Sequence, residues 1–427
     1  MNDDKVKVFK KLTRVDFANE KFQSQLNLRR LPLEDLPITD VLGRVLAKDV
    51  ISGIDVPYFD RSAVDGYALK AKETFAASRS NPIVFDVQGY IAAGTKSMIT
   101  LGKQQTVRIA TGACIPEGAD AVVLIESTQQ TGFDKVEVYS ALTPGQNIQT
   151  KGEDVKKEEK ILTRGTVIQP QDIGIMVSLQ MINVSVIRKP KVGVLSTGNE
   201  LVNFARDVEL GKIIDSNRPI LMAMIKNLGG EPIDLGIAKD ELEDIRSRIA
   251  IGLENSDVVL VSGGTSVGDV DLVPKAINSL GKPGILVHGI SMRPGKPTAL
   301  AAIGNKPVIL LPGFPVAAMI SFNVFVQPVL LKLMGSSSEQ HVKQTVQAKM
   351  LRGQPSSLGS RTYARVIVKS RGREYVAEPL TTHGSGVISS MIRANGLVII
   401  PENKEGLEEG EGVEVVLLRP LGDRNRE

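Results

Sequence analysis

The sequence is poor in the residue types on which disulfide-bonded domains and zinc sites depend. Its 427 residues include a single cysteine, Cys114, and three histidines. One cysteine excludes an intramolecular disulfide and a cysteine-based zinc cluster, and the histidines stand at no metal-ligand spacing. Tryptophan is absent and aromatic residues make up only 4%, so we expect a core of Ile, Val, Leu and Ala.

Strong net charge and long uninterrupted apolar segments are also lacking. The net charge is only +4, and no block of Lys and Arg is long enough to predict a nucleic-acid arm. The N-terminus is charged and does not read as a secretory signal. The longest apolar run, residues 316–334, contains Asn323, Gln327 and Lys332, which favours a buried helix over a membrane span. The sequence therefore predicts a cytoplasmic protein that binds neither nucleic acid nor membrane.

The chain is long enough for about two to four domains, and its patterns change along its length. Helical patterns on either side of a β-like stretch predict a discontinuous helical domain with a β-rich insertion. Nearly all-apolar strands then alternate with helices, which predicts an α/β domain whose mainly parallel sheet is covered on both faces. Short β-like runs at the end predict a small barrel. The predicted multidomain α/β and β fold divides into residues 1–50 with 158–189 (helical), 51–157 (inserted β), 190–335 (α/β) and 336–427 (C-terminal β barrel).

The strongest local signal for a site lies in residues 258–273, VVLVSGGTSVGDVDLV. An apolar strand runs into a glycine-rich turn, whose backbone N–H groups can surround an anion while Ser and Thr hydroxyls add donors. Asp269 and Asp271 follow at a spacing that suits a hard cation. A structural turn with solvated aspartates is the alternative, but the combination of strand, turn and paired aspartates favours a ligand site. The turn residues expected at the ligand are Gly263, Gly264, Thr265 and Ser266.

Two further turns add charged side chains. Residues 193–201, GVLSTGNEL, repeat the strand-to-glycine pattern and carry Glu200 just past the turn, although a helix-capping role is equally plausible there. Residues 291–300, SMRPGKPTAL, hold Arg293 and Lys296 on a turn stiffened by prolines, which predicts a preformed receptor for an oxyanion. Surface charges on an ordinary turn are the alternative.

The remaining candidates are weak when taken singly. In LPGFPVAA, Pro312 and Pro315 stand at a strand end and a helix start, where helix initiation alone accounts for Pro315. Asp65 and Thr111 lie beside glycine turns of the predicted insertion, and an Asp before Gly is usually only a turn residue. Cys114 is expected to be a small core residue rather than a nucleophile, because no histidine accompanies it.

Taken together and in order, these segments resemble the MoeA family and the E domain of gephyrin. The segments that carry the resemblance are SAVDGYAL, ATGACIPEGADAVV, GQNIQTKGEDV, STGNEL, DSNRP, SGGTSVGDVD, RPGKPTA and LPGFPVAA, and the match runs from about residue 32 to the tail. The resemblance implies a V-shaped homodimer with four domains per chain. Its cleft would lie between the α/β domain of one subunit and the inserted and C-terminal domains of the other.

The resemblance also implies a reaction. Adenylylated molybdopterin and molybdate (or tungstate) would react with the help of Mg²⁺ or another divalent cation, so that the metal enters the dithiolene and AMP is released. A molybdopterin adenylyltransferase is a possible partner.

The implied catalytic residues are Asp65, Thr111, Glu200, Asp240 and Asp271, with Asp154 nearby. The implied metal ligands are Asp269 and Asp271. The implied pterin-nucleotide residues are Thr197, Gly198, Gly263, Gly264, Thr265, Ser266, Pro312 and Pro315. The implied molybdate residues are Arg293, Lys296, Pro297, Arg365 and Ser385.

The sequence departs from the family pattern at four of these places. Phe314 and Ala317 replace an Asn and a Ser of the family, Gln149 stands where an Arg is usual, and Gly289 where many bacterial members have Lys. Two other functions compete. A molybdopterin adenylyltransferase shares the α/β domain but lacks the insertion and the barrel, and a dimeric scaffold of the gephyrin kind carries a fused second domain and linker that are missing here.

Overall fold

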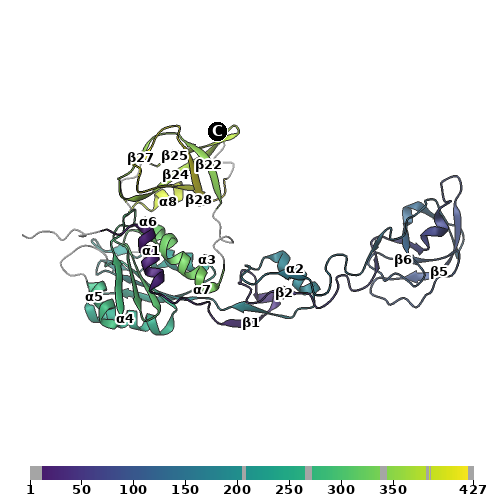
Figure 1. The fold of residues 1–427 in the computed structure, drawn as a ribbon, viewed down its shortest axis with the longest axis horizontal. Coiled ribbons are helices and arrows are strands. Elements are labelled where there is room, and N and C mark those ends of the chain that lie inside the picture. The colour runs from purple at the N-terminus through teal and green to yellow at the C-terminus, as the bar shows by residue number, and fades with distance from the viewer. Residues whose placement is uncertain are drawn as a thin grey trace, which may run out of the picture.

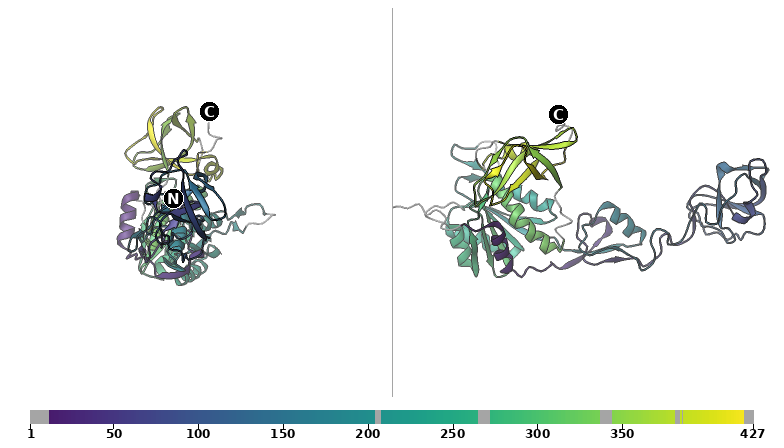
Figure 2. Two further views of the ribbon diagram at one scale, coloured as in Figure 1. Left: turned by 90° about the vertical axis from the view of Figure 1, so that its right-hand side faces the viewer. Right: turned by 45° about the horizontal axis from the view of Figure 1, so that its top comes forward.

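The computed structural model describes residues 12–203, 208–264, 272–336, 344–380, 384 and 386–421. The chain is elongated (Figure 1), with an α/β body at one end and a β barrel beside it. A small middle domain follows, and a second β domain lies at the far end. The views in Figure 2 show the same separation, so the far β domain does not touch the α/β body within one chain.

The α/β body is built on one six-stranded sheet in the order β16-β13-β17-β21-β20-β18. The first four strands are parallel, while β20 runs antiparallel to β21 and to β18. The central strand β17 is buried at every position, as expected for a parallel strand covered on both faces. The prediction of a mainly parallel α/β sheet is therefore confirmed. The strands are β13 (Lys191–Thr197), β16 (Glu231–Ala238), β17 (Val258–Ser262), β18 (Pro283–His288), β20 (Ala299–Ile303) and β21 (Lys306–Leu311).

Helices cover the two faces of this sheet with separate cores. On one face, α4 (Leu242–Asn255) and α5 (Leu272–Leu280) pack against side chains that include Val259 and Val261. On the other face, α1 (Val15–Ser24) and α3 (Asn217–Asn227) pack against side chains that include Val258 and Leu260. Alternate residues of one strand thus enter opposite cores, which is the two-residue period of a β-strand.

The long apolar segment forms a continuous helix against the second face. It consists of α6 (Pro315–Ser321), a π-helical turn (Phe322–Val326) and α7 (Gln327–Met334). Among the described residues only this helix has the length and hydropathy of a membrane span, yet 67% of it is buried within the protein. Phe322 and Phe325 are fully buried in the core. The prediction of a buried helix is confirmed.

The first fifty residues are less helical than their pattern predicts. Within residues 12–50 the only α-helix is α1, which packs on the α/β sheet through Val15, Ala18 and Phe22. The chain then extends to β1 (Leu33–Pro37), which pairs with β12 (Asn183–Ile187) in the middle domain. Apolar residues at helix-like spacing after α1 instead fill the middle core with α2 (Pro170–Ser178). The helical prediction for this stretch is wrong beyond α1, because tertiary burial overrides a short periodic pattern.

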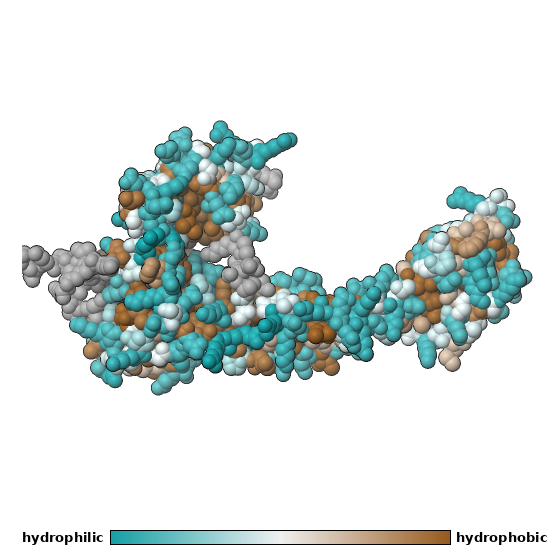
Figure 3. Space-filling view, viewed as in Figure 1, coloured by the Kyte–Doolittle hydropathy of each residue, from teal (hydrophilic) through white to brown (hydrophobic). Residues whose placement is uncertain are grey.

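Two chain segments lead from the middle domain to the inserted β domain. They lie antiparallel, joined by a bridge between Val56 and Val155 and by β3 (Arg61–Ser62) with β10 (Ile148–Gln149). Their surface is hydrophilic over most of its length (Figure 3), unlike the apolar patches on the domains at either side. The inserted domain is a six-stranded sheet in the order β7-β4-β6-β5-β9-β8. These strands are β4 (Gly66–Leu69), β5 (Ile83–Ile91), β6 (Gln105–Ile109), β7 (Ala121–Leu124), β8 (Thr128–Gln130) and β9 (Lys135–Val138).

The C-terminal region is a closed five-stranded barrel, as predicted. Its strands follow the order β24-β25-β22-β28-β26, and pairing of β24 with β26 closes the ring. One further strand, β19 (Met292–Arg293), reaches out of the α/β body and pairs with β24 in parallel. The barrel strands are β22 (Thr345–Met350), β24 (Arg361–Arg371), β25 (Glu374–Pro379), β26 (Gly396–Ile400) and β28 (Gly412–Leu417).

Candidate functional site

A cavity of about 670 Å³ opens at the carboxyl ends of the parallel strands. The chain after β13, β17 and β21 supplies Thr197, Gly263 and Pro312 to its wall. Parallel strands end together at one edge of a sheet, which is where open α/β folds bind ligands. The three turns that the sequence singled out are therefore brought together.

The glycine turn after β17 requires its glycines. Gly263 and Gly264 both have positive φ, of +94° and +62°. A Cβ on Gly263 would lie 2.4 Å from the Thr197 carbonyl oxygen, and one on Gly264 would lie 2.4 Å from Val273 Cγ2. The turn thus packs directly against its neighbours while its backbone lines the cavity. Four residues predicted to act here, Thr265, Ser266, Asp269 and Asp271, lie outside the described residues.

Buried polar atoms line the cavity without partners. The hydroxyls of Ser196 and Thr197 and the Asn217 side-chain oxygen form no hydrogen bond among the described residues. The Asn217 amide nitrogen donates to Ser262 Oγ and to the Gly313 carbonyl oxygen, each at 2.8 Å, which joins two of the turns. Unpartnered buried polar atoms destabilise a protein. A ligand with donors and acceptors would satisfy them.

Two helix N-termini also face the cavity. The α3 helix begins beside Ser216 and Asn217, and the long helix begins at Pro315 after Phe314. Free N–H groups and the helix dipole make each start favourable for an anion.

A buried ion-pair network fixes the start of α3. Arg218 donates from Nε to Asp215 at 3.0 Å and from Nη1 to Asp234 at 2.5 Å, and it also contacts Asn203. Burial alone would lower the pKa of Arg218, but the hydrogen bonds and charges of Asp234 and Asp215 raise it above its usual value. The guanidinium therefore stays charged and holds the DSNRP segment in place. The sequence pattern includes this motif but indicates no role for Asp215, Ser216 or Asn217, and no local signal predicts that Ser196 and Ser262 are buried here.

The two predicted carboxylates after β13 and β16 occupy different surroundings. Glu200 lines the cavity, and its oxygens lie 2.7 Å from the place of a Cβ on Gly198, whose φ of +151° favours glycine. Asp240 accepts from the Asn199 backbone at 3.0 Å, while its own N–H donates to the Asn199 side chain at 3.1 Å. Asp240 thus joins two strand ends beside the cavity, whereas Glu200 belongs to the cavity wall.

The predicted oxyanion loop is a compact turn beside the cavity. Pro297 lines the cavity, while Arg293 and Lys296 are exposed. The Ile290 N–H donates to the Lys296 carbonyl at 2.8 Å, and the Thr298 hydroxyl donates to the Gly295 carbonyl at 2.7 Å. The backbone of the loop is therefore held by its own hydrogen bonds, and its role as an oxyanion receptor stays a prediction.

The barrel of the same chain lies over the cavity, so the expectation that the C-terminal domain of the other subunit would line it is wrong for this cavity. Gly386 and Ile388 line it, and the Phe314 ring lies 3.2 Å from the place of a Cβ on Gly386. Neither barrel residue was singled out from the sequence, because no local pattern marks a domain contact. Ser385, predicted to bind molybdate, lies outside the described residues.

Arg365 presents a partly buried cation without a carboxylate partner among the described residues. Its Nη1 donates to Ser390 Oγ at 2.7 Å, and its Nε is buried without a hydrogen-bond partner. Burial lowers the pKa of Arg365 from its usual value. A bound anion would offset that desolvation, since charge-assisted hydrogen bonds are the strong ones.

The inserted domain holds its predicted residues far from this cavity. Asp65 accepts from the Thr111 backbone N–H at 2.8 Å, so the carboxylate orders the turn that carries Thr111. Both residues are exposed and lie next to β4 and β6 of the inserted domain, which is at the opposite end of the molecule from the α/β body (Figure 1), and Asp154 lies on the connection to that domain. Gln149 on that connection accepts from Arg61 at 2.8 Å. One chain alone does not bring Asp65 and Thr111 to the cavity.

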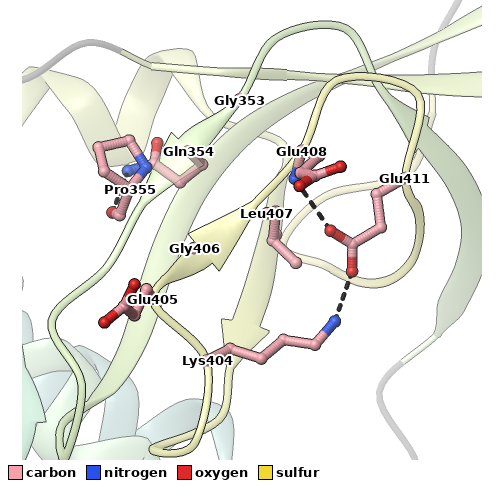
Figure 4. Close-up of a pocket in the computed structure, with 9 residues that line it drawn as sticks. All are labelled: Gly353, Gln354, Pro355, Lys404, Glu405, Gly406, Leu407, Glu408 and Glu411. Atoms are coloured by element: carbon pink, nitrogen blue, oxygen red, sulfur yellow. Dashed lines mark hydrogen bonds and ion pairs between the residues drawn. The ribbon is translucent and has the colours of Figure 1, made fainter.

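Two other observations bear on ligand sites. Within the described ranges, no group of three or more His, Cys, Asp or Glu side chains is placed to hold a metal ion. A second cavity of about 700 Å³ lies on the barrel (Figure 4), where Lys404 forms an ion pair with Glu411 and the Glu408 N–H donates to Glu411 at 2.9 Å. Its lining holds one cation, Lys404, and three carboxylates, those of Glu405, Glu408 and Glu411, so it does not suit an anionic ligand.

Comparison with known proteins adds to this geometry. Three family profiles match in succession: "MoeA N-terminal region (domain I and II)" over residues 13–179, "Probable molybdopterin binding domain" over 193–332 and "MoeA C-terminal region (domain IV)" over 347–418. A Bacillus subtilis protein named molybdopterin molybdenumtransferase is 35% identical over 389 residues, 90% of each chain. A Methanocaldococcus jannaschii protein named for molybdopterin biosynthesis is 37% identical over 400 residues, 91% of this chain and 92% of its own.

Comparison of the fold with solved structures also points to the MoeA family. A solved MoeA protein from Pyrococcus horikoshii superposes with a TM-score of 0.81 at 36% identity, covering 96% of this chain and all of that one. The matches span the insertion and the barrel as well as the α/β domain, which does not favour the adenylyltransferase alternative. The chain belongs to the MoeA family and is a transferase of molybdenum cofactor biosynthesis.

Proposed function

We propose that this protein inserts molybdate, or tungstate, into adenylylated molybdopterin and releases AMP. The observation that carries the proposal is the cavity itself. Unpartnered buried hydroxyls and two helix N-termini line it, and a preformed cationic loop lies beside it. The substrate carries a pyrophosphate and molybdate is a small dianion, so such a site must concentrate negative charge.

Each set of residues has a distinct task in this proposal. The Gly263–Gly264 backbone and the start of α3 would hold the phosphates, with Thr197 and Asn217 supplying polar contacts. Arg293, Lys296 and Arg365 would bind the oxyanion, two from the loop and one from the barrel. Cleavage of the pyrophosphate depends on in-line positioning and charge stabilisation more than on covalent chemistry.

A divalent cation such as Mg²⁺ belongs to the proposal as well. It would neutralise charge on the phosphates during their cleavage. Glu200 fits this task, because it is an exposed carboxylate in the lining of the cavity. Oxygen ligands of this kind suit Mg²⁺, and Asp269 and Asp271 remain the further predicted ligands.

The proposed active form is a cytoplasmic homodimer. Asp65 and Thr111 lie at the opposite end of the chain from the cavity, so they reach a cavity only in a second copy of the chain. A molybdopterin adenylyltransferase is the proposed supplier of the substrate.

The direct test is a metal-insertion assay. Purified protein is incubated with adenylylated molybdopterin and a divalent cation, and AMP release is followed with molybdate, with tungstate and with neither. We expect AMP release that depends on the oxyanion. Consumption of ATP with free molybdopterin, without oxyanion-dependent AMP release, would instead establish an adenylyltransferase.

A further inference from the structure

The oxyanion loop is held between two distant parts of the chain. The residues just before the loop, 289–292, pair on one side with Thr13. The Thr13 N–H donates to the Gly289 carbonyl at 3.1 Å, and the Thr13 carbonyl accepts from the Ser291 N–H at 2.8 Å. On the other side, the Arg361 N–H donates to the Ser291 carbonyl at 3.0 Å, and Met292 pairs with Arg361 in parallel. The segment that precedes Arg293 is thus the middle one of three extended segments.

Charged side chains tie the two flanking segments to each other. Arg361 donates from Nη1 and Nη2 to the two carboxylate oxygens of Asp16, at 3.0 and 2.6 Å. The same guanidinium pairs with Glu402 at 3.1 Å, and Glu402 is only 9% exposed. Two-point pairing of Arg with a carboxylate restricts geometry as well as adding energy. We call Asp16, Arg361 and Glu402 the clamp.

The clamp does not hold α1 in place. Val15, Ala18 and Phe22 are at most 1% exposed, so the helix docks on the sheet through its apolar face. The side chains of Asp16 and Arg361 are 71% and 20% exposed, and a half-exposed pair contributes little to stability. The two-point pair therefore calls for an explanation other than stability.

The clamp lies between two groups of cations that are predicted to bind the oxyanion, those of the loop and Arg365 of the barrel. Arg293 follows directly after Met292, which pairs with Arg361. Arg365 lies on β24 four residues beyond Arg361 and therefore on the same side of the strand. The loop cations come from the α/β body and Arg365 comes from the barrel, so an oxyanion between them depends on the spacing of two domains. We propose that Arg361, held by Asp16 and Glu402, is a positioning residue that sets this spacing for oxyanion binding; the inference rests on the proposed function.

The test compares Asp16→Asn and Arg361→Lys in the full chain with a matched control, Arg352→Gln. Arg352 pairs with Glu378 at 2.9 Å in the same barrel, with a side chain 57% exposed, and does not touch the loop. We expect the KM for molybdate to rise about tenfold in both clamp variants, which corresponds to about 1.4 kcal/mol. The KM for adenylylated molybdopterin and the melting temperature should stay near the wild-type values. Asp16→Glu should restore part of the loss, and the control should match wild type.

Hydrogen exchange gives a readout without turnover. In the clamp variants the Ser291 and Arg361 amides should exchange faster than in wild type, while amides of β17 should be unchanged. An unchanged KM for molybdate in an active clamp variant would overturn the inference, even with faster exchange, and would leave the proposed function intact. A wild-type protein without oxyanion-dependent AMP release would overturn the proposed function, and the inference with it.

Discussion

At the scale of single residues, Arg365 combines charge and burial without a carboxylate to balance them. We predict that Arg365→Gln raises the KM for molybdate by roughly one to two orders of magnitude, since a charge-assisted contact contributes about 1.5–3 kcal/mol. Stability should change little, because the substitution removes a cation whose pKa burial already lowers. Steady-state kinetics and thermal unfolding measure both effects. A large drop in melting temperature with an unchanged KM would make Arg365 a structural residue.

Among the residues that depart from the family pattern, Phe314 lines the cavity. Its side chain is 62% exposed and contacts Gly386 across the cavity mouth. An aromatic ring there offers a flat apolar surface to a planar heterocycle, worth about 0.5–1.5 kcal/mol beyond burial. We predict that Phe314→Asn weakens AMP binding several-fold by calorimetry and leaves binding of ribose 5-phosphate unchanged. Equal losses for the two ligands would show that the ring does not contact the base.

At the scale of elements, the ion pair between Asp16 on α1 and Arg361 on the barrel makes a small contribution to stability that depends on pH. Hydrogen bonds from Arg361 are the main cause that lowers the pKa of Asp16 below its usual 3.8. A carboxylate with a lowered folded-state pKa stabilises the fold above its unfolded pKa, and this contribution disappears as pH falls through the folded value. We predict that Asp16→Asn slightly lowers the free energy of unfolding at neutral pH, and that the difference declines as pH falls below 3.8 and is lost once pH lies below the lowered pKa of Asp16 in the folded state. Urea denaturation at a series of pH values measures it, and a difference that persists in acid would exclude the ion pair as its cause.

Some structural elements were predictable from the sequence and others were not. The all-apolar run of β17 and the glycine turn after it predicted a buried parallel strand ending at a ligand site, because both signals are local. The extended path after α1 was not predictable, since apolar residues at helical spacing there are buried by the distant strand β12 and helix α2. Gly386 and Ile388 were missed for the same reason. Their role depends on how the barrel sits over the sheet, which no local pattern encodes.

At the scale of the whole molecule, the distance between Asp65 and Glu200 predicts complementation between chains. Asp65→Asn and Glu200→Gln should each fold normally and each lose at least about a hundredfold in turnover, because a positioned carboxylate contributes at least that much to such a step. Random reassociation of the two inactive proteins should restore about one quarter of the active clefts, since each mixed dimer keeps one intact cleft. AMP release after mixing measures the recovery. Mixed dimers that form but stay inactive would show that each site is built within one chain.

The long exposed connection separates the inserted domain from the cavity of its own chain. It therefore also affects how the specific activity depends on protein concentration. In the proposed dimer the number of working sites follows mass action, so specific activity falls on dilution below the dimer dissociation constant and recovers on concentration. Addition of an excess of a chain that carries both Asp65→Asn and Glu200→Gln would then inactivate wild-type protein, because neither cleft of a mixed dimer would keep both carboxylates. A gene copy that encodes such a doubly substituted chain would therefore lower the activity of wild-type protein without lowering its amount.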